Sequence, residues 1–181
     1  HFMKAKGVLE TTVGYMGGHT EEPTYRQVCD GNTGHVETTE IVYDPTKTSF
    51  EELLKLYYET HDFEQVGGQG PDIGAQYQSV VFYVNDEQKQ MVEKYIKILQ
   101  DKGFSPATEL RAAPRFWPAE DYHQEYYDKK NGTPYCHIYR KIFWAKVIEL
   151  YNSPPELRSF PLVQGVSRIY YLQFKDVQFT I

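Results

Sequence analysis

The sequence has few cysteines and no clustered metal ligands. Only two cysteines occur in its 181 residues, Cys29 and Cys136, and neither belongs to a CxxC motif or to a Cys/His ligand spacing. A small disulfide-held fold uses more cysteines than this, and a structural zinc site uses several ligands at short spacings. The cysteine count therefore argues against both classes of protein.

Long apolar runs and basic clusters are absent as well. No stretch approaches the roughly 18 to 20 apolar residues of a membrane-spanning helix, and the first residues do not form a secretory signal pattern. The formal net charge is -6, and no Lys/Arg cluster occurs, so no basic surface for nucleic acid or an anionic membrane is expected. We expect a cytoplasmic protein whose partners include neither nucleic acid nor a membrane.

The composition is that of a folded globular protein. Hydrophobic residues make up 40% of the chain and aromatic residues 15%, with 16 Tyr and 10 Phe. A disordered chain carries far fewer apolar and aromatic side chains. The length fits one domain with a core of its own.

Strand and helix patterns are mixed along the chain. Apolar and polar residues alternate in stretches that predict strands, whereas capping residues and helical spacing predict helices. The expected strands cover residues 8–15, 35–43, 77–84 and 108–112, and the expected helices follow Ser49 and Asn85 and cover residues 119–129. Because no strict βαβ rhythm is present, we predict an α+β fold, a two-layer α/β sandwich with a mixed sheet and a ferredoxin-like core.

Glu37 is the first candidate for chemistry. It lies near the start of the predicted strand 35–43, on the same side of the pleat as Thr39, Ile41 and Tyr43. A carboxyl group buried among aromatic rings would have a raised pKa and could serve as a general acid. The alternative is a solvated glutamate at a strand end, which is the common situation of surface carboxylates.

Three further polar side chains lie next to turns. Asp72 lies in the glycine-rich stretch HDFEQVGGQGPDIGAQY, where an aspartate can also simply close an Asx turn. Tyr25 and Tyr77 each offer a phenol that can donate a hydrogen bond, although either could pack in the core. Long irregular loops in compact domains often carry function, so all three are candidates.

The two cysteines differ in their surroundings. Asp30, Glu21 and Glu22 oppose a thiolate at Cys29, whereas Arg26 and His35 could favour it. A buried inert thiol is expected there. Cys136 lies in Pro-Tyr-Cys-His, where the neighbouring His137 suits an exchanging thiol. The residues alone leave the role of Cys136 open.

Five stretches, taken together, resemble the A-type peptide methionine sulfoxide reductases, which act on the S epimer of methionine sulfoxide. They occur in the family's order, and they are VGYMGG, PTYRQVCDGNTGHVE, VYDP, HDFEQVGGQGPDIGAQY and AEDYHQEYY. The resemblance implies a sulfoxide site of Tyr25, Glu37, Asp72 and Tyr77. It also implies that the substrate is methionine sulfoxide, free or in proteins, and that no cofactor is bound. Thioredoxin or another dithiol is the implied reductant and partner.

The family's nucleophilic cysteine belongs to a Gly-Cys-Phe-Trp-Gly motif, and this motif does not occur in the 181 residues. The resemblance places it, with the first strand, upstream of His1. Cys136 lies near the place of a resolving cysteine in some members. The expected organisation is a catalytic domain over residues 1–144 and a C-terminal extension of unknown role over residues 145–181.

Two hypotheses of different class follow from the missing motif. In the first, the chain is part of a reductase whose nucleophile lies upstream, and it repairs oxidised proteins through a cysteine sulfenic acid. In the second, the chain is a binding module that recognises methionine sulfoxide without reducing it. Turnover of methionine sulfoxide with a dithiol separates the two.

Overall fold

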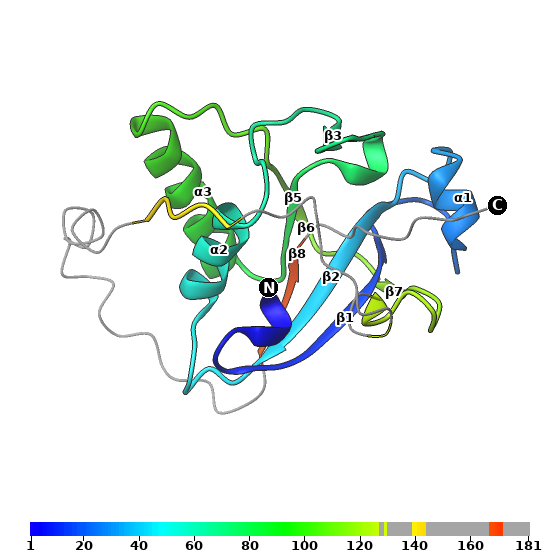
Figure 1. The fold of residues 1–181 in the computed structure, drawn as a ribbon, viewed down its shortest axis with the longest axis horizontal. Coiled ribbons are helices and arrows are strands. Elements are labelled where there is room, and N and C mark those ends of the chain that lie inside the picture. The colour runs from blue at the N-terminus through cyan, green and yellow to red at the C-terminus, as the bar shows by residue number, and fades with distance from the viewer. Residues whose placement is uncertain (127–128, 130–138, 144–166, 172–181) are drawn as a thin grey trace.

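The computed structural model describes residues 1–126, 129 and 139–143, together with the strand at residues 167–171. Its main sheet has six strands in the order β6-β5-β8-β2-β1-β7 (Figure 1). These strands are β1 (Val8–Met16), β2 (Val36–Tyr43), β5 (Val80–Tyr83), β6 (Glu109–Ala112), β7 (Trp117–Pro118) and β8 (Ser167–Tyr171). The pair β5 and β6 is parallel and the other pairs are antiparallel, so the sheet is mixed as predicted.

The helices and a small hairpin complete the described fold. The α-helices are α1 (Tyr25–Cys29), α2 (Phe50–Glu59) and α3 (Asp86–Asp101), the 3-10 helices are η1 (Phe2–Lys4) and η2 (Ala75–Tyr77), and the hairpin pairs β3 (Gly68–Gln69) with β4 (Asp72–Ile73). The predicted α+β class is confirmed. The strands predicted over residues 8–15, 35–43 and 108–112 are confirmed to within one residue at either end.

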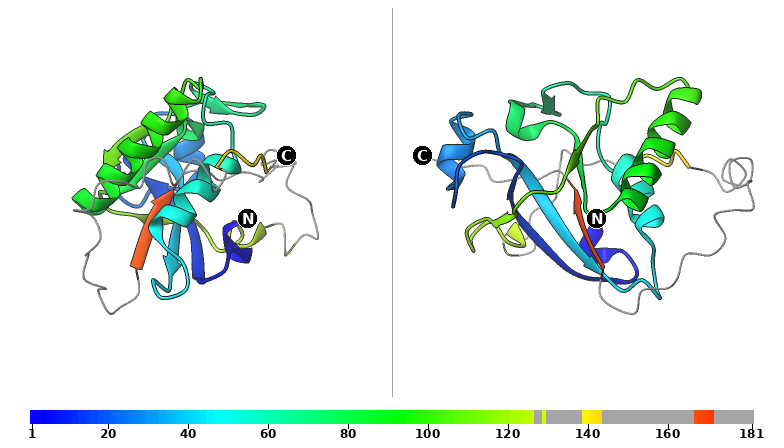
Figure 2. Two further views of the ribbon diagram at one scale, coloured as in Figure 1. Left: turned by 90° about the vertical axis from the view of Figure 1, so that its left-hand side faces the viewer. Right: turned by 180° about the vertical axis from the view of Figure 1, so that it is seen from behind.

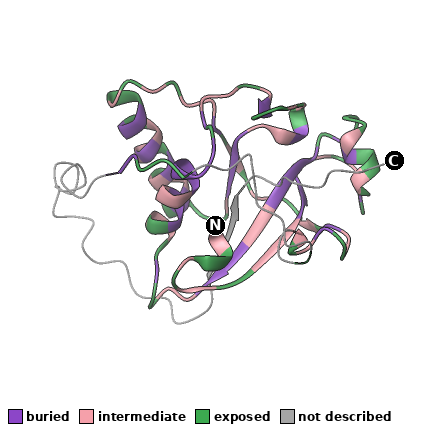
Figure 3. Cartoon of the chain, in the orientation of Figure 1, coloured by how far each residue is buried: buried purple, intermediate pink, exposed green. Residues whose placement is uncertain are grey.

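Helices α2 and α3 lie together on one side of the sheet, as the two views of Figure 2 show. The main core fills the space between these two layers, and Figure 3 shows buried residues concentrated there. Its side chains come from both helices and from the sheet and include Leu54, Tyr57, Tyr95, Leu99, Ile41 and Val81. Burial of this apolar area stabilises the sheet and so fixes the strand that carries Glu37.

The two predicted helix starts are confirmed by their caps. The Ser49 hydroxyl accepts from the Glu52 backbone N–H at 3.2 Å, and the Glu52 carboxylate accepts from the Ser49 N–H at 3.2 Å. The Asn85 side chain accepts from the Gln88 N–H at 2.8 Å at the start of α3. Each cap satisfies a backbone donor that the helix leaves without an intrahelical partner.

The helix predicted over residues 119–129 is wrong in its first part. Residues 121–125 form turns, and Glu125 has φ 53, a left-handed conformation that a continuous helix cannot contain. The Gln124 side chain instead pairs with the backbone of Val13 on β1, accepting at 2.9 Å and donating at 2.9 Å. These two hydrogen bonds bind the segment to β1, and the segment does not continue as a helix there.

The C-terminal part of the chain is described only in places. Residues 139–143 have no helical structure, and residues 144–166 and 172–181 lie outside the described residues. Strand β8 lies between β2 and β5 and is antiparallel to both. The predicted extension over residues 145–181 therefore contributes at least one strand to the main sheet.

Candidate functional site

Glu37 lies near the start of β2 and is 4% exposed. Its partner across the strand pair is Tyr15 of β1, so the two side chains share one face of the sheet. Val36 and Ile41 of the same strand are buried too. The solvated strand-end alternative is therefore excluded, and the carboxyl group has the buried setting that a general acid requires.

Helix α1 presents Tyr25 and Cys29 on one side, because residues four apart in a helix are neighbours. Thr24 caps the helix, and its hydroxyl and the Gln27 side chain form a capping box. Val28 is fully buried and seats the helix against the protein. The hydroxyl of Tyr25 forms a hydrogen bond with the Cys29 sulfur. Burial raises the pKa of Tyr25, and the hydrogen bond to Cys29 and the charge of Glu37 raise it further, so its phenol stays protonated.

Tyr77 reaches the same place from the opposite loop. It ends η2, directly before β5 enters the sheet. Burial, followed by the charge of Glu37, raises the pKa of Tyr77 to about 12. Its hydroxyl also forms a hydrogen bond with the Cys29 sulfur. The structure thus brings Tyr25, Glu37 and Tyr77 together, from three separated parts of the sequence.

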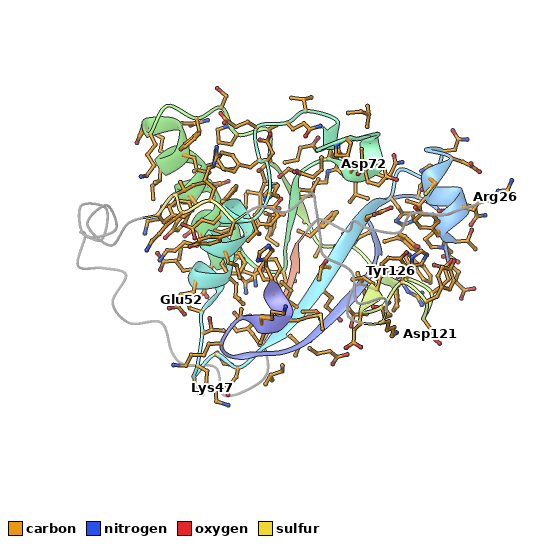
Figure 4. All side chains as sticks on the ribbon, viewed as in Figure 1. Arg26, Lys47, Glu52, Asp72, Asp121 and Tyr126 are labelled. Carbon is orange, nitrogen blue, oxygen red and sulfur yellow. The ribbon has the colours of Figure 1, made fainter. Side chains whose placement is uncertain are left out.

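Asp72 is half-buried in the hairpin β3-β4, which leads into the helix that carries Tyr77. Its hairpin partner is Gln69, whose side chain is buried and pairs with the backbone of Asp62 in both directions, at 2.9 and 3.1 Å. Figure 4 shows Asp72 on this hairpin, beside the end of the strands from which α1 departs. The hairpin is an ordered part of the fold and not a loose loop.

Cys29 is more exposed than the buried thiol that the sequence predicts. It is partly exposed and lies between the hydroxyls of Tyr25 and Tyr77. Burial raises the pKa of the Cys29 thiol, and the hydrogen bonds from the two phenols oppose that rise only in part. At neutral pH the thiol is therefore protonated and a weak nucleophile. The hydroxyls of Tyr25 and Tyr77 can therefore both reach one polar atom, here the Cys29 sulfur.

Sequence reasoning missed two residues beside the site, Glu120 and His123. The Glu120 carboxylate accepts from the Tyr25 backbone N–H at 3.0 Å and from the Tyr15 hydroxyl at 2.9 Å. The His123 ring packs on the Tyr25 ring with centroids 4.7 Å apart. The available signal was the stretch AEDYHQEYY, in which both residues are among aromatics, but its sequence does not show that it contacts α1.

The remaining sequence-based predictions concern a metal, a membrane and Cys136. Within residues 1–126 and the other described positions, no group of three or more His, Cys, Asp or Glu residues could hold a metal ion. None of the described helices is long and apolar enough to cross a membrane. Cys136, the candidate resolving thiol, lies outside the described residues.

Comparisons with known proteins give one consistent result. A family model described as peptide methionine sulfoxide reductase matches residues 1–153. A protein of Acinetobacter baumannii (strain SDF), named peptide methionine sulfoxide reductase MsrA, is 44% identical over 151 residues, which is 83% of this chain and 85% of that protein. A protein of the same name from Haloquadratum walsbyi is 42% identical over 147 residues, 81% of this chain and 84% of that protein.

Two solved structures are similar as well. Mxr1 from Saccharomyces cerevisiae in reduced form superposes with a TM-score of 0.69 at 29% identity, over 74% of this chain and 79% of that chain. Methionine sulfoxide reductase A of Corynebacterium diphtheriae superposes with a TM-score of 0.65 at 38% identity, over 75% of this chain and 69% of that chain.

Proposed function

Because the chain belongs to the peptide methionine sulfoxide reductase family, we propose that it reduces S-methionine sulfoxide, free or in proteins, with Tyr25, Glu37 and Tyr77 around the sulfoxide oxygen. The observation that carries these roles is the meeting of one buried carboxyl group and two phenols at one place. A sulfoxide oxygen is a strong acceptor, and the reaction must deliver a proton to it. Asp72 is proposed to shape the same pocket from the hairpin.

The two phenols bind the oxygen as hydrogen-bond donors. Their pKa values lie above the ordinary range, to about 12 for Tyr77, so both carry their protons at neutral pH. Glu37 is the proton donor, because buried carboxyl groups favour the neutral form. Donors placed before the reaction stabilise the charge that develops on the oxygen without reorganisation.

The attacking group is proposed to be the cysteine of the family's Gly-Cys-Phe-Trp-Gly motif, which these 181 residues do not contain. Its thiolate attacks the sulfoxide sulfur while the oxygen takes the proton from Glu37. The attack forms a bond between the cysteine sulfur and the methionine sulfur. The hydroxyl then moves from the methionine sulfur to the cysteine sulfur as this bond breaks, which releases methionine and leaves the cysteine as a sulfenic acid. A second thiol, for which Cys136 is proposed, then forms a disulfide and releases water. Thioredoxin or another dithiol opens this disulfide by exchange.

Each step of this sequence uses thiols and protons, so the mechanism as proposed needs no metal and no bound organic cofactor. No observation favours a module that only binds methionine sulfoxide. Residues 1–144 are proposed as the catalytic domain, with residues 145–181 as an extension. The cytoplasmic location stays a prediction.

The test replaces the proposed acid in the longest product of the gene that contains this sequence. Glu37→Gln is expected to slow reduction of S-methionine sulfoxide by about 10²-fold or more, the usual scale of general acid catalysis. Glu40→Gln is the matched control, because it alters the same strand on its opposite face and should leave the rate unchanged. Equal rates for Glu37→Gln and the unaltered protein would remove Glu37 from the role.

A further inference from the structure

Helix α1 is too short to fix its own position. It has five residues, hardly more than one turn, and its capping box fixes only the local backbone. A single turn is not stable by itself, because helix nucleation is unfavourable. Contacts from other parts of the protein must therefore hold Tyr25 where its hydroxyl can reach the sulfoxide.

The Glu120 carboxylate makes the most direct of these contacts. One oxygen accepts from the backbone N–H of Tyr25 at 3.0 Å, and the other accepts from the Tyr15 hydroxyl at 2.9 Å. Burial raises the pKa of Glu120, but the hydrogen bonds from Tyr25 and Tyr15 outweigh that effect and hold it below its ordinary value. At neutral pH the group is thus a carboxylate that accepts both bonds and has no proton to donate.

Glu120 thus bridges Tyr25 of α1 to Tyr15, a buried residue of β1. Tyr15 is 2% exposed and lies near the end of β1, between its partners Glu37 on β2 and Trp117 on β7. Through Glu120, the start of α1 is therefore bound to the cross-strand partner of the proposed acid. The bridge relates the position of Tyr25 to that of Glu37.

The segment that carries Glu120 is itself fixed to the sheet. The Ala119 N–H donates to the Val13 oxygen at 2.8 Å. The Gln124 side chain accepts from the Val13 N–H and donates to the Val13 oxygen, both at 2.9 Å. These bonds lie on either side of Glu120 in the sequence and restrict its movement. Figure 4 shows the segment, with Asp121 labelled, below the part of α1 that bears Arg26.

The His123 ring packs against the ring of Tyr25. His123 is 2% exposed, and its ring lies 4.7 Å from the Tyr25 ring and 4.1 Å from the Tyr122 ring, measured between centroids. The His123 backbone N–H donates to the backbone carbonyl oxygen of Glu120 at 2.9 Å. The Tyr25 phenol is therefore packed by a buried ring whose own position depends on the turn that begins at Glu120.

We propose that Glu120 is a positioning residue for the reduction, which holds the Tyr25 hydroxyl in register with Glu37 through its two hydrogen bonds. This inference rests on the proposed role of Tyr25. A donor to a developing charge must be placed within a fraction of an ångström, and small misplacements cost large factors in rate. Glu120 acts through Tyr25 and does not touch the sulfoxide.

The experiment compares variants in two backgrounds, the unaltered gene product and Tyr25→Phe. Glu120→Ala in the unaltered background should lower kcat about 10-fold or more, with a smaller change in KM. Glu120→Gln should recover part of this loss, because it keeps one oxygen acceptor. In the Tyr25→Phe background, Glu120→Ala should have little further effect, since the hydroxyl that it positions is absent. Asp121→Ala, an exposed neighbour, is the matched control and should change nothing.

Amide hydrogen exchange of residues 25–29 gives a readout that does not depend on activity. Glu120→Ala should speed exchange there and leave the amides of β1 and β2 protected. An equal fall in kcat in both backgrounds would overturn the proposal, because Glu120 would then act independently of the Tyr25 hydroxyl. Unchanged exchange of α1 would overturn it as well. If the unaltered protein reduced no sulfoxide, the proposed function would fail, while the exchange result would still decide the positioning.

Discussion

Glu59, the last residue of α2, binds the returning segment 139–143 to the core. One of its carboxyl oxygens accepts from the backbone N–H groups of Ile142 at 2.8 Å and Phe143 at 2.9 Å. Its backbone oxygen accepts from the Arg140 N–H at 2.7 Å. Glu59 is 7% exposed, Ile142 5% and Phe143 7%, so water has little access to these bonds. Replacing Glu59 should therefore loosen a segment that closes the main core.

The size of the effect follows from the two backbone donors. Glu59→Ala removes the acceptor of both, and a buried donor without a partner costs about 1 to 3 kcal/mol. We predict that Glu59→Ala lowers the free energy of unfolding by about 2 to 6 kcal/mol in sum. For a chain of this length such a loss corresponds to a fall in Tm of about 4 to 24 °C.

The assay is urea unfolding followed by tryptophan fluorescence, with Glu59→Gln as the matched variant. Both backbone bonds go to the same oxygen, so a glutamine can keep them, and its loss should stay below about 1 kcal/mol. The reasoning would be refuted if Glu59→Ala and Glu59→Gln destabilised the protein equally, or if Glu59→Ala cost less than about 1 kcal/mol.

Two other predictions concern the surroundings of the site. Because burial raises the pKa of Cys29, its alkylation by iodoacetamide should be slow at pH 7, and the rate should rise about tenfold per pH unit up to pH 9. Peptide mass mapping follows the alkylation of Cys29 separately from that of Cys136. A rate that reaches a plateau below pH 8 would contradict the raised pKa of Cys29. At Gly14, an added Cβ would collide with the backbone oxygen of Trp117 and the Phe116 ring. Gly14→Ala should therefore lower the free energy of unfolding by about 1 to 3 kcal/mol in urea titrations, and an unchanged midpoint would show that β7 can shift without cost.

Local signals in the sequence were sufficient for α2, α3 and the strands β1, β2, β5 and β6. Ser49 and Asn85 begin α2 and α3 because their side chains accept from backbone donors a few residues away, an interaction that depends only on nearby residues. The alternation around Glu37 likewise predicts β2. Residues 119–129 show the limit, since their helical pattern yielded to the bonds between Gln124 and Val13, which no local pattern contains.

The sequence by itself determined the family, the fold class and the four candidate residues, because these depend on residue types in long ordered motifs. Only the tertiary structure decided that Glu37 is buried, that Cys29 lies between the hydroxyls of Tyr25 and Tyr77, and that Glu120 bridges α1 to β1. Burial and hydrogen bonding between distant segments depend on how the sheet and its loops pack together. The spacing of residues along the chain does not predict these contacts.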